Sequence, residues 1–492
     1  MTRPHTVSPP RSSTIAAHPE RELKLSVGDA FRLPRLPGTL LPRRLLLSTY
    51  YDTAAYDLAH ARITLRRRIE RGKKTWQLKL PLNQDRLEVE VPADQTNPPA
   101  SLCRLLMVHL GHRNLRPVVT LRVWRTGLQI RQGHMPLAEI ALDRVAVEKD
   151  GHIVQRFREL EIERQQGDDD LLLTLERQMR DAGASDHDGR PKFFRALSLP
   201  PAPPVHPPDR KASVGTQVQW VLAQHVEWLL AHDPGTRLGT EIESLHQMRV
   251  AVRRIRAVLR TARPVLLPAW VTSLDQELEW LGEVLGPARD LDVQIAYFLE
   301  ESSGLDARDR PLLESFLARL RAQRQAAQET LLSQLTSERY FELIRQLRQA
   351  AQAPAIIESS ATMQELAGRA FKKVRQAIKG LRAAPSDRTL HKVRIKAKRA
   401  RYAAELAKGS VGKSAGRFIK AARAVQDLLG IHQDATQAER YVRQFLKDST
   451  SPRAGFVAGR MVERQHQRRQ TVRTTMTPLF KRLLKRGKKV WG

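Results

Sequence analysis

Hydrophobic positions along the chain follow two different periods, and the change occurs near residue 200. Before that point, apolar and polar residues alternate in short segments interrupted by glycine and proline, which is typical of β-strands with one buried face. After it, apolar residues recur every three or four positions to the end of the chain, as in amphipathic helices. The pattern predicts an α+β multidomain protein with a strand-rich N-terminal part and an all-helical C-terminal part.

The predicted elements of the first part are short. One helix is expected at 169–182, behind the cap-like pair Gly167-Asp168. The alternating segments that predict strands are 20–27, 62–69, 75–80, 86–91, 118–124, 137–143 and 157–162.

A proline-rich segment separates the two parts. Six of the eleven residues from 199 to 209 are proline, which indicates an extended, semi-rigid linker. We therefore predict a disordered tail at 1–18, a first domain at 19–198, a linker at 199–210 and a helical domain at 211–492. The helical pattern breaks again at 351–360, which divides that domain into repeats at about 211–350 and 360–492.

Two sequence elements occur twice in the helical part, in the same order. Leu-His-x-x-Arg begins a basic stripe at Leu245 and again at Leu390, and Leu-Gly-x-x-x-Asp follows at Leu285 and Leu429. The two offsets are nearly equal, which favours a duplicated bundle. At helical spacing each stripe lies on one side of its helix. The stripe residues are His246, Arg249, Arg253 and Arg256 in the first repeat, and His391, Arg394, Lys398 and Arg401 in the second.

The net charge shows which partner such stripes favour. The chain carries 84 Lys and Arg against 52 Asp and Glu, a formal charge of +32, and most of the excess lies beyond residue 365. Stacked cations destabilise a helix unless an anion lies along it, so the charge predicts a polyanionic partner: nucleic acid, an anionic membrane surface or inorganic polyphosphate. Aromatic residues make up only 5% of the chain, which disfavours stacking on nucleobases.

Cysteine usage and hydropathy indicate the compartment. Cys103 is the single cysteine, so the sequence has no disulfide framework and no cysteine-based zinc site. No apolar run approaches the roughly 20 residues of a membrane span, and the polar start lacks the apolar core of a signal peptide. We therefore expect a cytoplasmic protein without a membrane partner.

Charged residues share one face of several predicted strands. Glu20, Glu22 and Lys24 alternate along the first strand, as do Arg66 and Arg68 along another. A solvated outer face explains any one strand, whereas several such strands favour a charged face that holds a divalent metal and phosphate oxygens.

The N-terminal segments resemble the CYTH domain of the triphosphate tunnel metalloenzymes, in order, over about residues 18–200. The matching motifs are Glu-x-Glu-x-Lys at Glu20, the segment ending in Arg66 and Arg68, and the later segments around Lys79, Glu88, Arg122, Asp143 and Glu159. The resemblance implies an eight-stranded antiparallel β tunnel that binds a triphosphate chain with Mg²⁺ or Mn²⁺.

The resemblance also implies roles for single residues. The chain departs from the family where a serine is expected shortly before Lys192, while Arg122 and Arg125 have opposite strand parity, so one of them should face outward. Glu20, Glu22 and Lys24 are the expected catalytic residues. The expected metal ligands are Glu20, Glu22, Asp143, Glu159 and Glu161. The expected triphosphate contacts are Lys24, Arg66, Arg68, Lys79, Arg122, Arg125 and Lys192, with Glu88 and Glu90 lining the tunnel.

The helical part resembles the CHAD domain, the conserved histidine α-helical domain, over about residues 211–492. The resemblance rests on the His-x-x-Arg-x-x-x-[Arg/Lys] and Leu-Gly-x-x-[Arg/Gln]-Asp elements. It implies a pair of four-helix bundles whose stripes bind inorganic polyphosphate. Fused in this order, the two domains resemble a bacterial inorganic triphosphatase architecture.

Several functions remain open from the sequence. The first is a metal-dependent hydrolase of inorganic triphosphate whose helical domain binds polyphosphate, in the cytoplasm or on polyphosphate granules. The second is a non-catalytic polyphosphate-binding sensor or granule tether. Adenylate cyclase is a weaker alternative, and nucleic-acid binding is weaker still.

Overall fold

The computed structural model describes residues 16–20, 22–82, 85–93, 95–111, 113–188, 190–198, 206–240, 242–301, 306, 308–447 and 451–492, with the backbone alone at 16–20, 82, 85 and 86. The chain forms two compact units, residues 1–204 and 205–492. The predicted tail lies outside the described residues up to residue 15, and 16–18 belong to a strand. Of the predicted linker, 199–205 lie outside the description.

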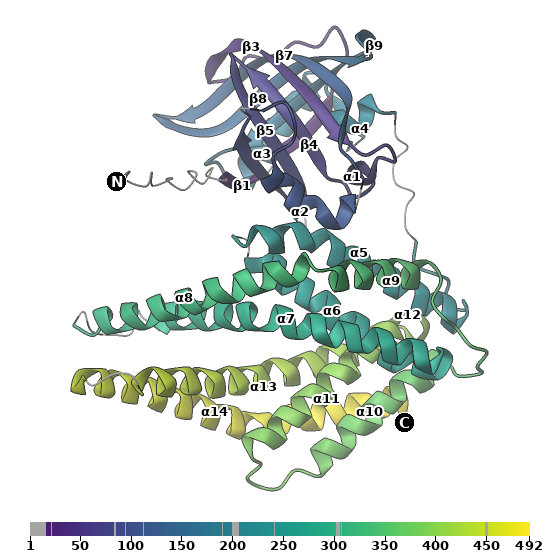
Figure 1. The fold of residues 1–492 in the computed structure, drawn as a ribbon, viewed down its shortest axis with the longest axis vertical. Coiled ribbons are helices and arrows are strands. Elements are labelled where there is room, and N and C mark those ends of the chain that lie inside the picture. The colour runs from purple at the N-terminus through teal and green to yellow at the C-terminus, as the bar shows by residue number, and fades with distance from the viewer. Residues whose placement is uncertain are drawn as a thin grey trace, which may run out of the picture. The chain divides into compact units, whose positions relative to one another are not determined.

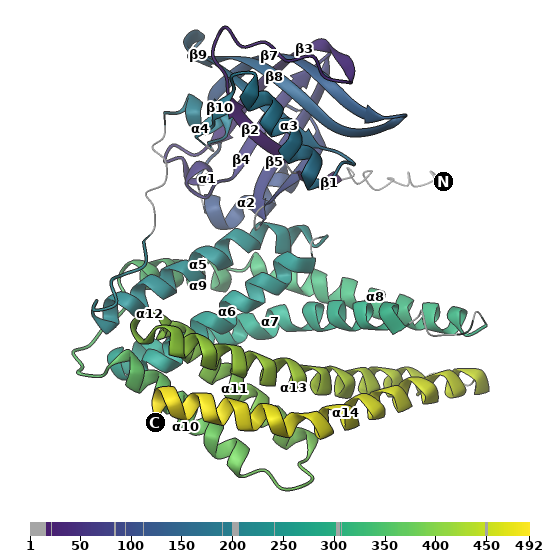
Figure 2. The same ribbon diagram turned by 180° about the vertical axis from the view of Figure 1, so that it is seen from behind.

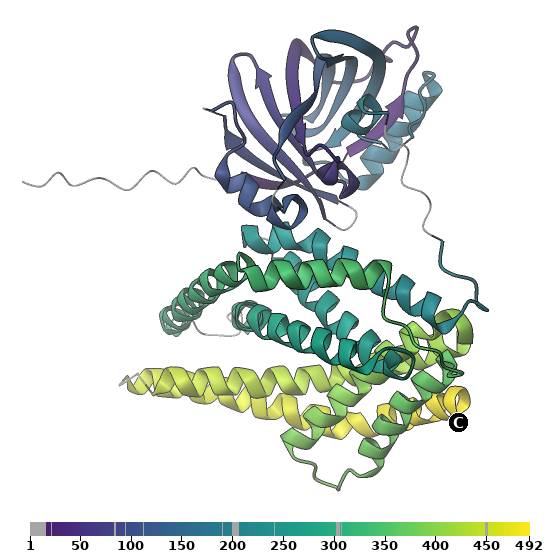
Figure 3. The same cartoon turned by 45° about the vertical axis from the view of Figure 1, so that its right-hand side comes forward.

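The first unit is an antiparallel sheet that closes on itself (Figure 3). In space the strands follow the order β1-β6-β5-β4-β3-β7-β8-β9-β2-β10. The consecutive strands β1 and β2 pair with β6 and β9, the two ends of the remaining sheet, so the chain joins those ends. If β1 and β2 count as one strand, the ring has the predicted eight, and β10 adds an edge. Their bounds are β1 Ala16–Glu20, β2 Glu22–Ser26, β3 Thr39–Asp52, β4 Thr64–Glu70, β5 Lys73–Leu82, β6 Asp85–Pro92, β7 Arg116–Gln132, β8 Met135–Lys149, β9 His152–Arg164 and β10 Ser185–Asp186.

Local sequence explains the hairpins and the small helices of this unit. Arg71-Gly72 and Asp150-Gly151 adopt positive φ at both positions, as two-residue turns between twisted strands require. Asp168 caps α3 by accepting the backbone N–H of Leu171. The helices are α1 Asp57–His60, α2 Ala100–Leu110, α3 Asp169–Asp181 and α4 Lys192–Ala196.

The strand prediction omitted β3, one of the longest strands of the sheet. Its sequence does not alternate cleanly, because Leu45, Leu46 and Leu47 are consecutive, with Leu46 buried and Leu45 exposed on the other face. The seven predicted strand segments each overlap a strand of the structure, and α3 matches the predicted helix.

The second unit is helical throughout, and its helices are interrupted between α9 and α10, close to the predicted break in the helical pattern at 351–360 (Figures 1 and 2). Serine or threonine side chains cap α5, α9, α10, α11 and α14 by accepting a backbone N–H three residues on. The bounds are α5 Val214–Leu238, α6 Ile242–Ala262, η1 Arg263–Val265, α7 Pro268–Glu301, α8 Arg310–Leu335, α9 Glu338–Gln352, α10 Met363–Lys379, α11 Asp387–Leu406, α12 Lys408–Val411, α13 Lys413–Leu446 and α14 Pro452–Trp491.

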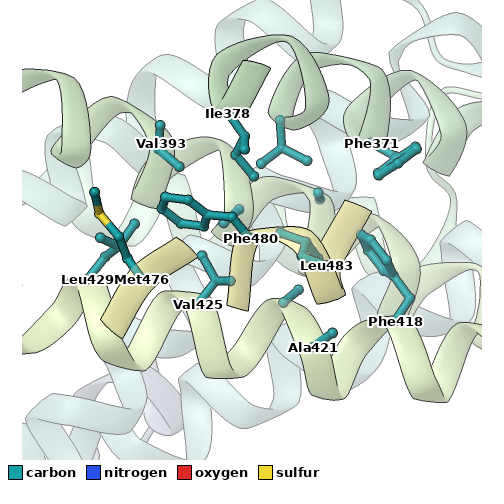
Figure 4. Close-up of a cluster of buried hydrophobic side chains, with 14 of the residues drawn as sticks. Phe371, Ile378, Val393, Phe418, Ala421, Val425, Leu429, Met476, Phe480 and Leu483 are labelled. Carbon is teal, nitrogen blue, oxygen red and sulfur yellow. The ribbon is translucent and has the colours of Figure 1, made fainter. Parts of the chain in front are cut away.

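The helical unit has cores of two kinds. One lies within the second half, where Phe371, Phe418 and Phe480 pack among α10, α11, α13 and α14 (Figure 4). Another joins the halves, because Phe298 and Phe316 of α7 and α8 share a cluster with residues of α13 and α14. The two repeats therefore share apolar core as well as sequence. Among the described helices, every one is too short or too polar to span a lipid bilayer.

Candidate functional site

The closed sheet encloses a charged cavity of about 210 Å³. Alternate residues of its strands point inward, so the predicted charged residues of different strands meet there. The charged residues that line it are Glu22, Lys24, Arg66, Arg68, Lys79, Glu88, Glu90, Arg125, Asp143, Glu161, Glu163 and Lys192.

Three carboxylates converge at one side of this cavity. Asp143 of β8 lies opposite Glu159 of β9 in the strand register, and Glu161 lies two residues further on. The Asp143 and Glu159 side chains are fully buried, and the Glu161 side chain is 11% exposed. Buried carboxylates are stable only when cations or hydrogen-bond donors face them.

The cations that face these carboxylates come from β2, β7 and α4. The Lys192 Nζ of α4 lies 2.9 Å from Asp143, 3.1 Å from Glu159 and 2.7 Å from Glu161. Lys24 forms ion pairs with Glu161 and, at 3.1 Å, with Glu22. Each ammonium thus bridges carboxylates from different positions along the sheet.

A bidentate pair completes this network. The Arg125 guanidinium donates to both oxygens of Asp143, at 2.8 and 2.7 Å, and to Glu161 at 2.6 Å. Burial alone would raise the pKa of Asp143 and of Glu161, but the positive charges of Lys192 and Arg125 have the larger effect. The pKa of Asp143 is therefore lowered, and that of Glu161 is lowered well below its ordinary value. The carboxylates are therefore ionised at neutral pH.

Cations dominate the opposite side of the cavity. Burial, together with the neighbouring Arg66 and Arg125, lowers the pKa of Arg68 to about 10. Lys79 lies 3.4 Å from Glu88. Crowded guanidinium groups in a buried space are stabilised by an anion, and a planar guanidinium can donate two hydrogen bonds to one phosphate.

Sequence analysis missed two residues that hold Arg66. Its Nη1 donates to the Tyr50 hydroxyl at 3.0 Å, and its Nε donates to Gln77 at 2.7 Å. The Tyr50 ring stacks on Phe193 of α4, with ring centres 4.7 Å apart. Both residues point inward by strand alternation, but they carry no charge, so no charge pattern could identify them.

The structure corrects one predicted phosphate contact. Arg122 lies on the outer face of β7, with a half-exposed side chain that donates to Glu148 at 2.7 Å. Strand alternation places Arg125 inside and Arg122 outside, which resolves the conflict of parity between them. The side chain of Glu20, a predicted catalytic residue and metal ligand, lies outside the described residues.

Three of these carboxylates offer the donor atoms of a divalent-metal site. Their oxygens are the ligands that Mg²⁺ and Mn²⁺ prefer, and Asp143, Glu159 and Glu161 all approach one point. Lys192 Nζ stands at that point, and among the described residues no group of three or more carboxylates, histidines or cysteines surrounds an open metal position. The donor chemistry fits a divalent cation, provided that the Lys192 ammonium moves away from the carboxylates.

In the helical unit, each repeated arginine contacts the repeated glycine of its own half. Arg249 of α6 donates to the Gly286 carbonyl at 3.4 Å and pairs with Asp290 of α7 at 2.5 Å. Arg394 of α11 lies against Gly430 of α13, 3.6 Å from where a Cβ would be. This contact explains why the two elements recur at nearly the same offset.

The predicted stripes separate into paired and unpaired cations. Arg256 pairs with Asp275 and Glu279 at 2.8 and 2.9 Å, and Arg401 pairs with Glu405 at 3.0 Å. Both charges are already neutralised, which weakens their assignment to an anion. Among the described residues, Arg253, Arg394 and Lys398 form no ion pair within 4 Å.

The two stripe histidines differ in their surroundings. Burial and the nearby Arg289 of α7 lower the pKa of His246. The His391 Nδ1 is buried without a hydrogen-bond partner. Arg289 was not among the predicted residues, although it belongs to the Leu-Gly-x-x-[Arg/Gln]-Asp element.

Comparison with known proteins identifies both domains. The CYTH domain model matches residues 18–194, and the CHAD domain model matches residues 221–443. The Mycobacterium tuberculosis protein Rv2226, described as uncharacterized, is 28% identical over 528 aligned positions, which cover 96% of this chain and 98% of that protein.

Two solved structures resemble the chain over about half of its length. PptA from Streptomyces chartreusis is 21% identical and covers 55% of this chain and 100% of its own, with a TM-score of 0.47. The CHAD domain from the plant Ricinus communis is 25% identical and covers 58% of this chain and 96% of its own, with a TM-score of 0.46.

The two family matches cover most of the chain, in the order that the sequence predicted. The chain belongs to the CYTH–CHAD two-domain proteins. Its N-terminal domain is a member of the tunnel family of phosphoryl-transfer enzymes and hydrolases.

Proposed function

We propose that the CYTH domain hydrolyses inorganic triphosphate with Mg²⁺ or Mn²⁺, and that the CHAD domain binds inorganic polyphosphate. The observation that carries the first part is a cavity inside the closed sheet, with carboxylates on one side and crowded cations on the other. Its volume of about 210 Å³ is below the ~300 Å³ at which pockets for drug-sized ligands begin. That size favours a bare phosphate chain over a nucleoside triphosphate.

The cavity residues have complementary roles in this reaction. Arg66, Arg68 and Arg125 orient the chain and stabilise charge that develops on its oxygens. Water attacks the terminal phosphorus, the bond to the bridging oxygen breaks, and orthophosphate and pyrophosphate leave while a proton passes to solvent.

The acidic side of the cavity would hold the metal. Glu22, Asp143, Glu159 and Glu161, with Glu20, are the proposed ligands. A divalent metal, when bound, supplies neutralisation of the phosphate oxygens and Lewis acidity. Lys24 and Lys192 already hold these carboxylates in place, and Lys192 would turn toward the phosphate once the metal replaces it.

Phosphate release from the purified protein tests this proposal. Triphosphate, pyrophosphate, ATP and thiamine triphosphate are compared with and without Mg²⁺ or Mn²⁺, and cyclic AMP is measured in parallel. We expect metal-dependent release from triphosphate, and little from ATP. If none of the substrates released phosphate, the proposal would be refuted. Formation of cyclic AMP from ATP would support adenylate cyclase activity instead.

One observation favours a non-catalytic sensor as the second candidate. Lys192 neutralises the carboxylates that a metal needs, and a protein that never exchanged this ammonium for a metal would bind phosphate without hydrolysing it. Triphosphate binding by calorimetry, without turnover at any metal concentration, would establish this alternative.

Polyphosphate binding by the CHAD domain is supported by the three unpaired cations of α6 and α11. The measurement is binding of long-chain polyphosphate and of duplex DNA to the full chain across a salt series. Affinity should fall steeply with salt, and Arg394→Ala should weaken it. Arg345→Ala, which removes the same charge from the exposed face of α9, is the matched control. Tighter binding of DNA would contradict the proposal.

A further inference from the structure

The two halves of the CHAD domain differ at one position of their shared motif. His-x-x-Arg-x-x-x-Arg in α6 ends at Arg253, whereas the same motif in α11 ends at Lys398. An arginine keeps its charge at every physiological pH, but a lysine in a buried or crowded site can lose its proton. The substitution therefore places one titratable cation among permanent ones.

Lys398 is crowded by positive charge on two sides. On its own helix, Arg394 precedes it by four residues and Arg401 follows by three, so both share its face. Helix α6, which packs against α11, brings further guanidinium groups. The titratable and charged groups that act on this site include Arg394, Arg401 and Tyr402 of α11, Arg249 and Arg253 of α6, Asp427 and Asp434 of α13, and Asp290 of α7.

In the described part of the chain, no carboxylate compensates for this crowding at close range. Within the described ranges, Lys398 forms no ion pair within 4 Å. Asp434 acts on it only over a longer distance, and Asp290 is held by Arg249. Burial first, and then Arg394, Arg253 and Arg249, lower the pKa of Lys398 to about 7.

We propose that Arg253, Arg394 and Lys398 form an anion subsite in which Lys398 takes up a proton when a phosphate chain binds. The inference rests on the proposed function of the CHAD domain and adds its regulation by pH. Near neutral pH the empty subsite carries both arginine charges and about half of the Lys398 charge, and it becomes fully charged under a bound polyanion.

The sign of the coupling follows from the local charges. A phosphate beside Lys398 favours the ammonium, so the bound form holds the proton more tightly than the free form. Below pH 7 the lysine is protonated in both forms, and its contribution to affinity is constant. Above pH 7 the affinity should fall about tenfold per pH unit, until the pKa of the bound form is reached.

Titration calorimetry in buffers of different ionisation enthalpy measures the proton directly. Long-chain polyphosphate is titrated into the full chain with EDTA at pH 8, because its interior phosphates do not titrate near neutrality. We expect uptake approaching one proton in the native protein. Lys398→Arg should bind with almost no uptake, and more tightly than the native protein at pH 8.5.

Two further variants test whether Lys398 itself takes up the proton. Lys392→Arg makes the same exchange at an exposed position of α11 and should keep the native proton uptake. Lys398→Met should also abolish the uptake, but it should bind more weakly than the native protein below pH 7. Subtracting the Lys398→Arg value removes protons taken up elsewhere, at His246 or in the tunnel.

The outcomes separate the two proposals. If the native protein does not bind polyphosphate between pH 6 and 9, the proposed function of the CHAD domain fails. If it binds with the same proton uptake as Lys398→Arg, the domain binds polyphosphate but the proton-coupled subsite is wrong.

Discussion

Arg125 and Arg122 lie three residues apart on β7 and face opposite sides of the sheet, so replacing each by methionine compares the interior with the exterior. Arg125 is 13% exposed and pairs with the fully buried Asp143, whereas Arg122 is 49% exposed and pairs with Glu148. Each change removes one guanidinium and leaves an apolar side chain of similar length. Arg125→Met breaks the ion pairs with Asp143 and Glu161, and Arg122→Met breaks the one with Glu148.

The expected losses of stability and of activity differ several-fold between the two variants. Removing one partner of a buried pair costs about 3–5 kcal/mol. The lower end applies here, because Lys192 still holds Asp143 at 2.9 Å. The surface pair should contribute about 0–1 kcal/mol. For hydrolysis, loss of one charged phosphate contact of about 1.5–3 kcal/mol lowers kcat/KM roughly 10- to 150-fold in Arg125→Met, and Arg122→Met should be unchanged.

Region-resolved hydrogen exchange of the full chain measures the local effect on β7 and β8, and phosphate release measures the catalytic effect. The pKa of Asp143 is lowered in the folded protein, so its contribution to stability is present above about pH 4 and is lost as pH falls through the folded value. The difference between native protein and Arg125→Met should therefore shrink below pH 4. If Arg125→Met and Arg122→Met lost equal protection and equal activity, the placement of Arg125 inside the sheet and Arg122 outside it would be refuted.

Three further predictions concern single groups. Glu22→Gln should abolish metal-dependent phosphate release and leave the circular dichroism melt unchanged, and undiminished turnover would sink the metal assignment. Tyr50→Phe keeps the ring stack but removes an acceptor of Arg66, so kcat/KM for triphosphate should fall about tenfold, whereas native kinetics would show that Arg66 needs no such support. Asp434→Asn removes a negative charge near Arg394 and Lys398, so calorimetry should show tighter polyphosphate binding; weaker binding would contradict this electrostatic argument.

Strand alternation was sufficient to predict which charged residues share a face, but not which of them meet. Arg66 and Arg68 are two residues apart, so their common orientation follows from the sequence alone. The approach of Lys192 to Asp143 and Glu159 depends on the sheet register and on the position of α4, which no local pattern contains. The role of Tyr50 was hidden for a similar reason, since its hydrogen bond to Arg66 joins two neighbouring strands.

The helical stripes show the same limit. Helical spacing placed Arg253, Arg256 and Lys398 on basic faces, and the structure bears out those helices. Spacing could not show that Asp275 neutralises Arg256, because Asp275 lies on a different helix and nineteen residues away. Which cations remain available to a ligand is a property of tertiary packing.

The closure of the sheet by its first strand has a consequence for biosynthesis. Glu22 of β2 lies opposite Glu163 of β9, so a ribosome releases the first strand long before its partner exists. Until β9 emerges, the nascent domain exposes unpaired strand edges, which can pair with other chains. The ring of strands can close only after β9 has been synthesised, so the nascent domain stays open until nearly all of its strands exist.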